Sequence, residues 1–122
     1  MKIRVGQIPY LNCTPFYHGL TREDIAVYPM VPTALTRAAE NGEIDTGPVP
    51  IVDCFRIEDK FTSLGQFCVS TLEKAGSVLL FSKVPIEKLG GTRVGVTHES
   101  STSHQLLKVL LAHKYSIEPE KY

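Results

Sequence analysis

Residues 25–50 read IAVYPMVPTALTRAAENGEIDTGPVP, and this stretch sets out the elements from which the fold class follows. Ile25–Met30 has the composition of a short strand. From Pro32 onward apolar side chains recur on one helical face, and Asn41-Gly42 supplies a C-terminal stop. Ile44 then opens another short strand, which runs into a Gly/Pro-rich turn. Strand, helix and strand in this order predict a β-α-β unit of an α/β protein.

The flanking sequence continues the alternation. Strands are predicted at residues 2–8, 62–70, 77–83 and 93–97. Helices are predicted from Pro15 through Leu20, at 51–57, at 85–89 and from Thr102 to about His113. The whole order predicts an α/β protein with a mostly parallel sheet.

The last predicted helix carries a leucine-rich face, formed by Leu106, Leu107, Leu110 and Leu111. We expect no strand after this helix, so its β-α-β unit lacks the second strand. The leucine face then needs cover from the first lobe, from another chain or from a segment that has been cut off. A homodimer that exchanges this helix is one such arrangement.

Composition narrows the function classes. The 122 residues carry 13 basic and 13 acidic side chains, and no basic stripe suggests nucleic acid as a partner. The three cysteines and four histidines show no metal-ligand spacing, so we expect neither a metal nor a cofactor. The sequence contains no signal peptide and no apolar run long enough for a membrane span. These features predict a cytoplasmic protein without membrane contact.

The strongest candidate for chemistry is the run of small hydroxyl residues at a strand-to-helix junction: Ser100, Ser101, Thr102 and Ser103. A helix N-terminus offers unpaired N–H groups and a partial positive charge, and it can bind a carboxylate or a phosphate. Plain helix capping explains the same residues and is favoured by the local sequence alone.

Three further candidates lie in turns near predicted strands. Tyr10 and Asn12 follow the first strand, where ligands of open α/β sheets bind, although an Asx-type turn also explains Asn12. Gly47 follows the third strand and allows close backbone approach, or simply forms a turn. Gly76 and Ser77 offer backbone N–H groups to a ligand, or belong to an ordinary β-turn.

In the order in which they occur, five segments resemble the menaquinone-biosynthesis family that contains chorismate dehydratase and dihydroxynaphthoate synthase. The segments are Ile8–Pro15, Val31–Leu35, Glu43–Pro50, Gly76–Ser82 and Val96–Ser103. The Tyr10-Leu11-Asn12 turn favours the dehydratase branch. The resemblance implies a periplasmic-binding-protein type II fold with two lobes around a ligand cleft. Lobe one would span residues 1–89, residues 90–122 would open lobe two, and the chain would be truncated.

The resemblance also implies a reaction, the loss of water from chorismate to give 3-(1-carboxyvinyloxy)benzoate. Residues 100–103 would then hold one carboxylate of chorismate, and Gly76 and Ser77 would contact the same carboxylate or the second one. Asn12 would sit beside the reacting ring carbons, while the proton acceptor stays open. Two alternatives remain, a non-catalytic protein of the same fold that binds a small carboxylate, and an inactive fragment.

Overall fold

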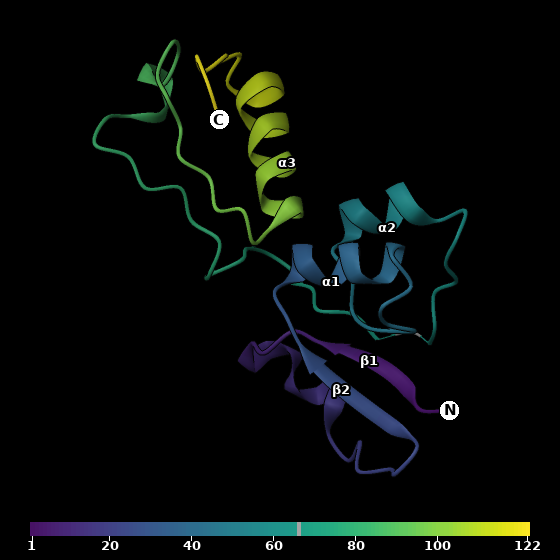
Figure 1. Ribbon diagram of the computed structural model, residues 1–122. Coiled ribbons are helices and arrows are strands. Elements are labelled where there is room, and N and C mark those ends of the chain that lie inside the picture. Colours follow the sequence, from purple (N-terminus) through teal and green to yellow (C-terminus); the bar gives the residue numbers. More distant parts are fainter. Residues whose placement is uncertain (66) are drawn as a thin grey trace. The chain divides into compact units, whose positions relative to one another are not determined.

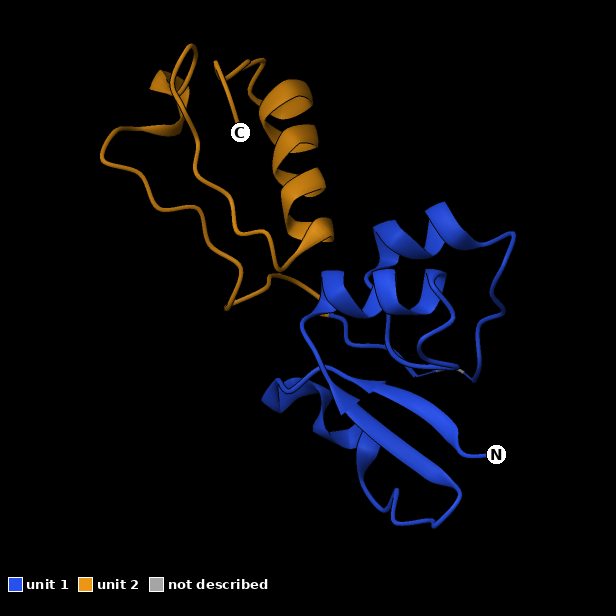
Figure 2. Cartoon of the chain, viewed as in Figure 1, with its two compact units in different colours: residues 1–70 blue, residues 71–122 orange. Residues whose placement is uncertain are grey.

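The computed structural model describes residues 1–65 and 67–122. The chain divides into two compact units, residues 1–70 and residues 71–122 (Figure 2). Each unit has its own buried core. The predicted division into lobes at residue 89 stays a prediction.

Unit 1 contains a parallel pair of strands, β1 (Ile3–Gln7) and β2 (Ile25–Pro29), which lie side by side (Figure 1). The register runs from Ile3 opposite Ile25 to Gln7 opposite Pro29. The strand predicted to start at Ile44 is reduced to one parallel bridge between Val5 and Thr46. Since Val5 also pairs with β2, Thr46 must use the other edge of β1. The predicted parallel arrangement is thus confirmed as a two-stranded sheet with a third segment at its edge.

Two helices of unit 1 confirm predictions from the sequence. α1 (Pro32–Glu40) starts with a proline in its first turn and ends where the Asn41 N–H bonds the Arg37 carbonyl oxygen at 3.0 Å. Gly42 follows in the left-handed region, with φ of +70°, as a helix stop requires. α2 (Ile51–Ile57) has the predicted bounds.

The core of unit 1 gathers around Leu35, which is completely buried. Its buried members come from the residues that follow β1, from α1 and from the segment after α1: Ile8, Cys13, Leu35, Ala38, Ala39 and Ile44. The helix face predicted from the spacing of Ala34, Leu35, Ala38 and Ala39 packs into the core at the last three positions, whereas Ala34 is exposed. The core fixes the turn after β1, because Ile8 and Cys13 flank that turn and are both buried.

The helix predicted from Pro15 through Leu20 has different bounds. A 3₁₀ helix, η1 (Leu11–Tyr17), starts four residues earlier than predicted, and Pro15 lies inside it. The Cys13 N–H bonds the Tyr10 carbonyl oxygen at 2.9 Å and begins the helical turn before the proline. Gly19, at φ of +77°, then redirects the chain.

The strands predicted at 62–70 and 77–83 are wrong for the residues that the structure describes. Residues 61–65 and 67–85 form neither strand nor helix. Val78 is 51% exposed, Leu79 63% and Phe81 86%. An apolar run becomes a strand only when another strand offers backbone hydrogen bonds, and no described segment pairs with this one.

Unit 2 contains a short 3₁₀ helix, η2 (Ile86–Lys88), at a predicted position, and the helix α3 (Ser101–Val109), which continues as a π-helical turn, η3 (Leu110–Lys114). The predicted long C-terminal helix is thereby confirmed. Leu89, Leu111 and Ile117 form the buried core, with Leu107 packed against it. Leu106 and Leu110 stay 51% and 40% exposed, so only half of the leucine face is covered.

The segment after η3 returns alongside the predicted strand at 93–97, contrary to the expectation that no strand follows the helix. The Val94 N–H bonds the Lys121 carbonyl oxygen, and the Glu120 N–H bonds the Thr92 carbonyl oxygen, both at 2.9 Å. The strand itself is reduced to a single parallel bridge between Arg93 and Lys121. A rudimentary β-α-β unit therefore closes within residues 91–122.

None of the helices in the described part of the chain has the length and apolar character of a membrane span.

Candidate functional site

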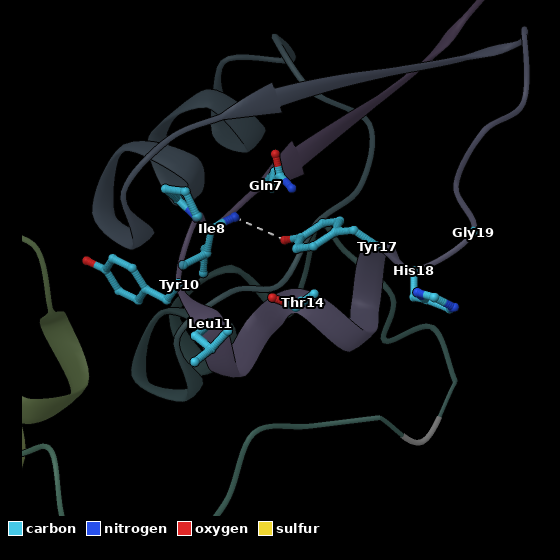
Figure 3. Close-up of a pocket in the computed structure, with 9 residues that line it drawn as sticks. Gln7, Ile8, Tyr10, Leu11, Thr14, Tyr17, His18 and Gly19 are labelled. Carbon is cyan, nitrogen blue, oxygen red and sulfur yellow. Dashed lines mark hydrogen bonds between the residues drawn. The ribbon is translucent and has the colours of Figure 1, made fainter.

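An open depression of about 690 Å³ lies at the carboxyl end of β1 (Figure 3). The end of the strand forms one side and η1 the other. Its lining residues are Gln7, Ile8, Pro9, Tyr10, Leu11, Thr14, Tyr17, His18 and Gly19. The position agrees with the general location of ligands in α/β folds, beyond the carboxyl ends of parallel strands. The lining combines apolar faces with amide, hydroxyl and imidazole groups, which suits a small organic molecule with polar substituents.

Two of the predicted site residues belong to the turn that borders this depression. Tyr10 lines it and is 41% exposed. Asn12 is exposed on η1, but it is not among the lining residues. Tyr10 therefore lies at the depression and Asn12 beside it, and substrate contact stays a prediction for both residues.

Four polar lining residues were not predicted: Gln7, Thr14, Tyr17 and His18. Thr14 belongs to the motif that drew attention to Asn12, so its position just past the strand was a usable signal. Tyr17 had no such signal, since its hydroxyl reaches back to β1. The Ile8 N–H donates to that hydroxyl at 3.0 Å (Figure 3), and the hydroxyl donates to the Gly6 carbonyl oxygen at 3.2 Å. Burial raises the pKa of Tyr17, so it remains a neutral donor.

Gly47 has a packing role. A Cβ added there would lie 3.0 Å from the Gly6 carbonyl oxygen and 3.3 Å from Cδ1 of Leu35. The residue lets the segment at residues 44–47 approach β1 closely, and it does not line the depression. The close approach at Gly47 is therefore to the protein's own backbone, and substrate contact at Gly47 stays a prediction.

The hydroxyl cluster at residues 100–103 caps α3. The Ser100 hydroxyl donates to Oγ of Ser103 at 2.9 Å and accepts from the Ser103 N–H at 3.4 Å. Capping, the alternative favoured by the local sequence, is therefore present. All four residues of the cluster are partly exposed, so the helix N-terminus also keeps an accessible surface for an anion.

Gly76 and Ser77 lie in an exposed, irregular stretch of unit 2. The Thr71 hydroxyl donates to the Lys74 carbonyl oxygen at 2.9 Å, which closes a turn just before them. An added Cβ at Gly76 would meet no atom within 4 Å. Gly76, Ser77 and residues 100–103 belong to unit 2, and Tyr10, Asn12 and Gly47 to unit 1. A single site that includes both groups remains a prediction.

Within the described part of the chain, no group of three His, Cys, Asp or Glu side chains lies close enough together to hold a metal ion. Burial raises the pKa of the Cys13 thiol, and it does the same for Cys54, so both stay protonated near neutral pH.

Sequence comparison relates the chain to known proteins. A family model described as menaquinone biosynthesis matches residues 3–122. The chain is 36% identical over 107 residues to a protein named chorismate dehydratase from Thermus thermophilus. The matched region covers 88% of this chain and 39% of that relative, so the chain spans about two-fifths of the relative's length.

Proposed function

Because the chain belongs to the menaquinone biosynthesis family, we propose that it carries part or all of a chorismate dehydratase, which removes water from chorismate to form 3-(1-carboxyvinyloxy)benzoate. The observation that carries the proposal is the 36% identity to a protein of that name over nearly all of this chain. The depression beside Tyr10 supports it, because it lies where an α/β protein places a small ligand.

For the fold we propose the two-lobed periplasmic-binding-protein type II architecture, with residues 1–89 in lobe one and residues 90–122 opening lobe two. The parallel β1–β2 pair, with α1 and α2 following it, agrees with such a lobe. The short parallel bridge between Arg93 and Lys121 agrees with the start of a second one. Ligands would then lie in the cleft between the lobes.

The proposed reaction makes modest demands on the protein. Chorismate carries two carboxylates and a cyclohexadiene ring, and loss of a hydroxyl with a neighbouring ring proton makes that ring aromatic. Aromatisation supplies the driving force. The protein therefore needs to orient the diene, neutralise the carboxylates and assist one proton transfer.

The residues available fit these tasks. The N-terminus of α3, with Ser100, Ser101, Thr102 and Ser103, would hold one carboxylate through hydroxyl and backbone N–H donors. Gly76 and Ser77 would contact the same carboxylate or the second one. Tyr10 would lie against the substrate ring, and Asn12 would orient the departing hydroxyl. The substrate's own carboxylate would accept the proton.

A turnover assay tests the proposal. The 122-residue protein is incubated with chorismate, and the product is followed by absorbance and identified by mass spectrometry. A chimera in which residues 1–122 replace the matched region of the Thermus enzyme serves as a second sample. Product formation by either one supports the proposal. Binding of chorismate without product in both would favour the carboxylate-binding alternative, and absence of binding as well would refute both.

Asn12→Ala is the first variant to compare, and Asn41→Ala is its matched control, because Asn41 is an exposed asparagine at the end of α1. We expect Asn12→Ala to lose about 100-fold or more in kcat, the lower end of what removal of one positioned hydrogen-bond donor costs. Asn41→Ala should keep the wild-type rate. Equal rates in the two variants would remove Asn12 from the mechanism.

Pairing of two copies through the C-terminal helix is also a proposal. Leu106, Val109 and Leu110 are each at least 40% exposed on that helix and leave an apolar surface for a partner. Light scattering on the protein should give the mass of two chains, and Leu106→Glu should return it to one. A monomeric mass for the wild-type protein would exclude this pairing.

A further inference from the structure

The turn of residues 9–12 carries the two predicted site residues of unit 1, Tyr10 and Asn12, and it is held at both ends. At one end, Ile8 is 7% exposed and its N–H donates to the Tyr17 hydroxyl at 3.0 Å. At the other end, Cys13 is 6% exposed in the core. Between these two points the side chains at residues 9–12 are all exposed. The buried residues at both ends therefore restrict the conformation of the turn.

We propose that Tyr17 is a positioning residue for the reaction, because its hydroxyl fixes the turn that presents Tyr10 and Asn12. This inference rests on the proposed function. The hydroxyl uses both of its hydrogen-bonding capacities on backbone atoms at the end of β1, accepting from Ile8 and donating to Gly6 at 3.2 Å. It thereby links η1 to the strand from which the turn departs (Figure 3).

The Tyr17 ring is itself held in place. It packs against the buried core of unit 1 and meets the Phe16 ring edge-on, with the ring centroids 6.3 Å apart. Deletion of the hydroxyl would leave the ring seated and remove only the two backbone contacts. Ile8 and Gly6 are buried, so their freed N–H and carbonyl groups would have to shift towards water to recover a partner. The turn would move with them.

Tyr17→Phe tests the inference, with Thr36→Val as the control. Thr36→Val also removes one hydroxyl from the interior of unit 1, but that hydroxyl bonds Asp53 between the two helices, away from the turn. Both rates are measured well below the unfolding temperature and divided by the folded fraction from circular dichroism. We expect Tyr17→Phe to lower kcat about tenfold with KM for chorismate within about twofold, and Thr36→Val to keep kcat. Equal kcat values per folded molecule would overturn the inference.

Amide hydrogen exchange supplies a readout that needs no activity. In Tyr17→Phe the amides of Ile8 and residues 10–13 should exchange about tenfold faster than in the wild-type protein, whereas Thr36→Val should leave them unchanged. Unchanged exchange in Tyr17→Phe would show that the hydroxyl does not anchor the turn. If neither the wild-type protein nor the chimera turned over or bound chorismate, the proposed function would be refuted, and the exchange comparison would still decide the anchoring role.

Discussion

The Arg4 guanidinium and the Asp45 carboxylate form a two-pronged ion pair, with Nη2 2.7 Å from Oδ1 and Nε 3.1 Å from Oδ2. The Arg4 N–H also donates to Asp45 Oδ2 at 2.7 Å, and the Asp45 N–H bonds the Arg4 carbonyl oxygen at 2.8 Å. These contacts join β1 to the segment at residues 44–47 at the second edge of the sheet. The pair thus helps to attach this segment to β1, where a full third strand would use a complete set of backbone hydrogen bonds.

The first prediction concerns the acid stability of this pair. The Arg4 side chain, and after it the Arg4 backbone N–H, lowers the pKa of Asp45 from 3.8 to about 2. Because the folded-state pKa is the lower one, the stabilisation is complete above pH 3.8 and is lost as the pH falls towards 2. Asp45→Asn should therefore be less stable than the wild-type protein at neutral pH. The gap, that is, the difference between their free energies of unfolding, should narrow as the pH falls from 3.8 towards 2.

Urea unfolding followed by circular dichroism between pH 7 and pH 2 measures that gap. Asp24→Asn is the matched control, since Asp24 also pairs with an arginine, Arg22, but only two residues away. That pair joins no separate segments, so its loss should change stability less. A constant gap between Asp45→Asn and wild-type protein across the acidic interval would contradict the prediction.

The second prediction concerns the contact between Gly47 and Gly6. Gly47→Ala would bring a methyl group to 3.0 Å from a backbone oxygen, which cannot move aside as a flexible side chain can. We expect the free energy of unfolding to fall by about 1–3 kcal/mol, the usual cost of overpacking. Gly95→Ala is the control, because an added Cβ there meets no atom within 4 Å. Unchanged stability with lost chorismate binding would instead favour a direct ligand role for Gly47.

The third prediction concerns the polar link between α1 and α2. Asp53 is 8% exposed and accepts a hydrogen bond from the Thr36 hydroxyl at 3.1 Å. Thr36→Val leaves that buried carboxylate with one donor fewer, so the free energy of unfolding should fall by about 1–3 kcal/mol. Thr62→Val, at an exposed position, should change it far less. Equal urea midpoints for the two variants would show that Asp53 does not depend on this donor.

Local signals predicted α1, α2 and α3 well, but not the bounds of η1. In α1 the start at Pro32, the stop at Asn41-Gly42 and the apolar spacing all lie within the helix's own sequence. The strands depended on partners that the local sequence does not reveal. The apolar run at residues 77–83 looks like a buried strand but pairs with no strand among the described residues. Residues 118–121, three of which are charged, instead return beside Arg93 through backbone hydrogen bonds.

The candidate site shows the same difference between residues with a local sequence signal and residues that act through tertiary contacts. Tyr10 could be predicted because residues just past a strand face the usual ligand position, and the structure places it on the depression. Tyr17 could not, because its hydroxyl acts through tertiary contacts with Gly6 and Ile8. Ser100 was predicted with two alternatives, and the cap that the structure shows is compatible with both of them.

Ser100→Asp separates the cap from the ligand site. An aspartate can still accept from the Ser103 N–H, and its charge suits a helix N-terminus, so stability should stay near that of the wild-type protein. The same charge would repel a carboxylate ligand, and chorismate affinity measured by calorimetry should fall about tenfold or more. Ser82→Asp is the matched control, since Ser82 also accepts a backbone N–H, that of Val84. If Ser100→Asp bound chorismate as tightly as Ser82→Asp does, Ser100 would be a cap alone, because a carboxylate held at that helix end could not tolerate the added charge.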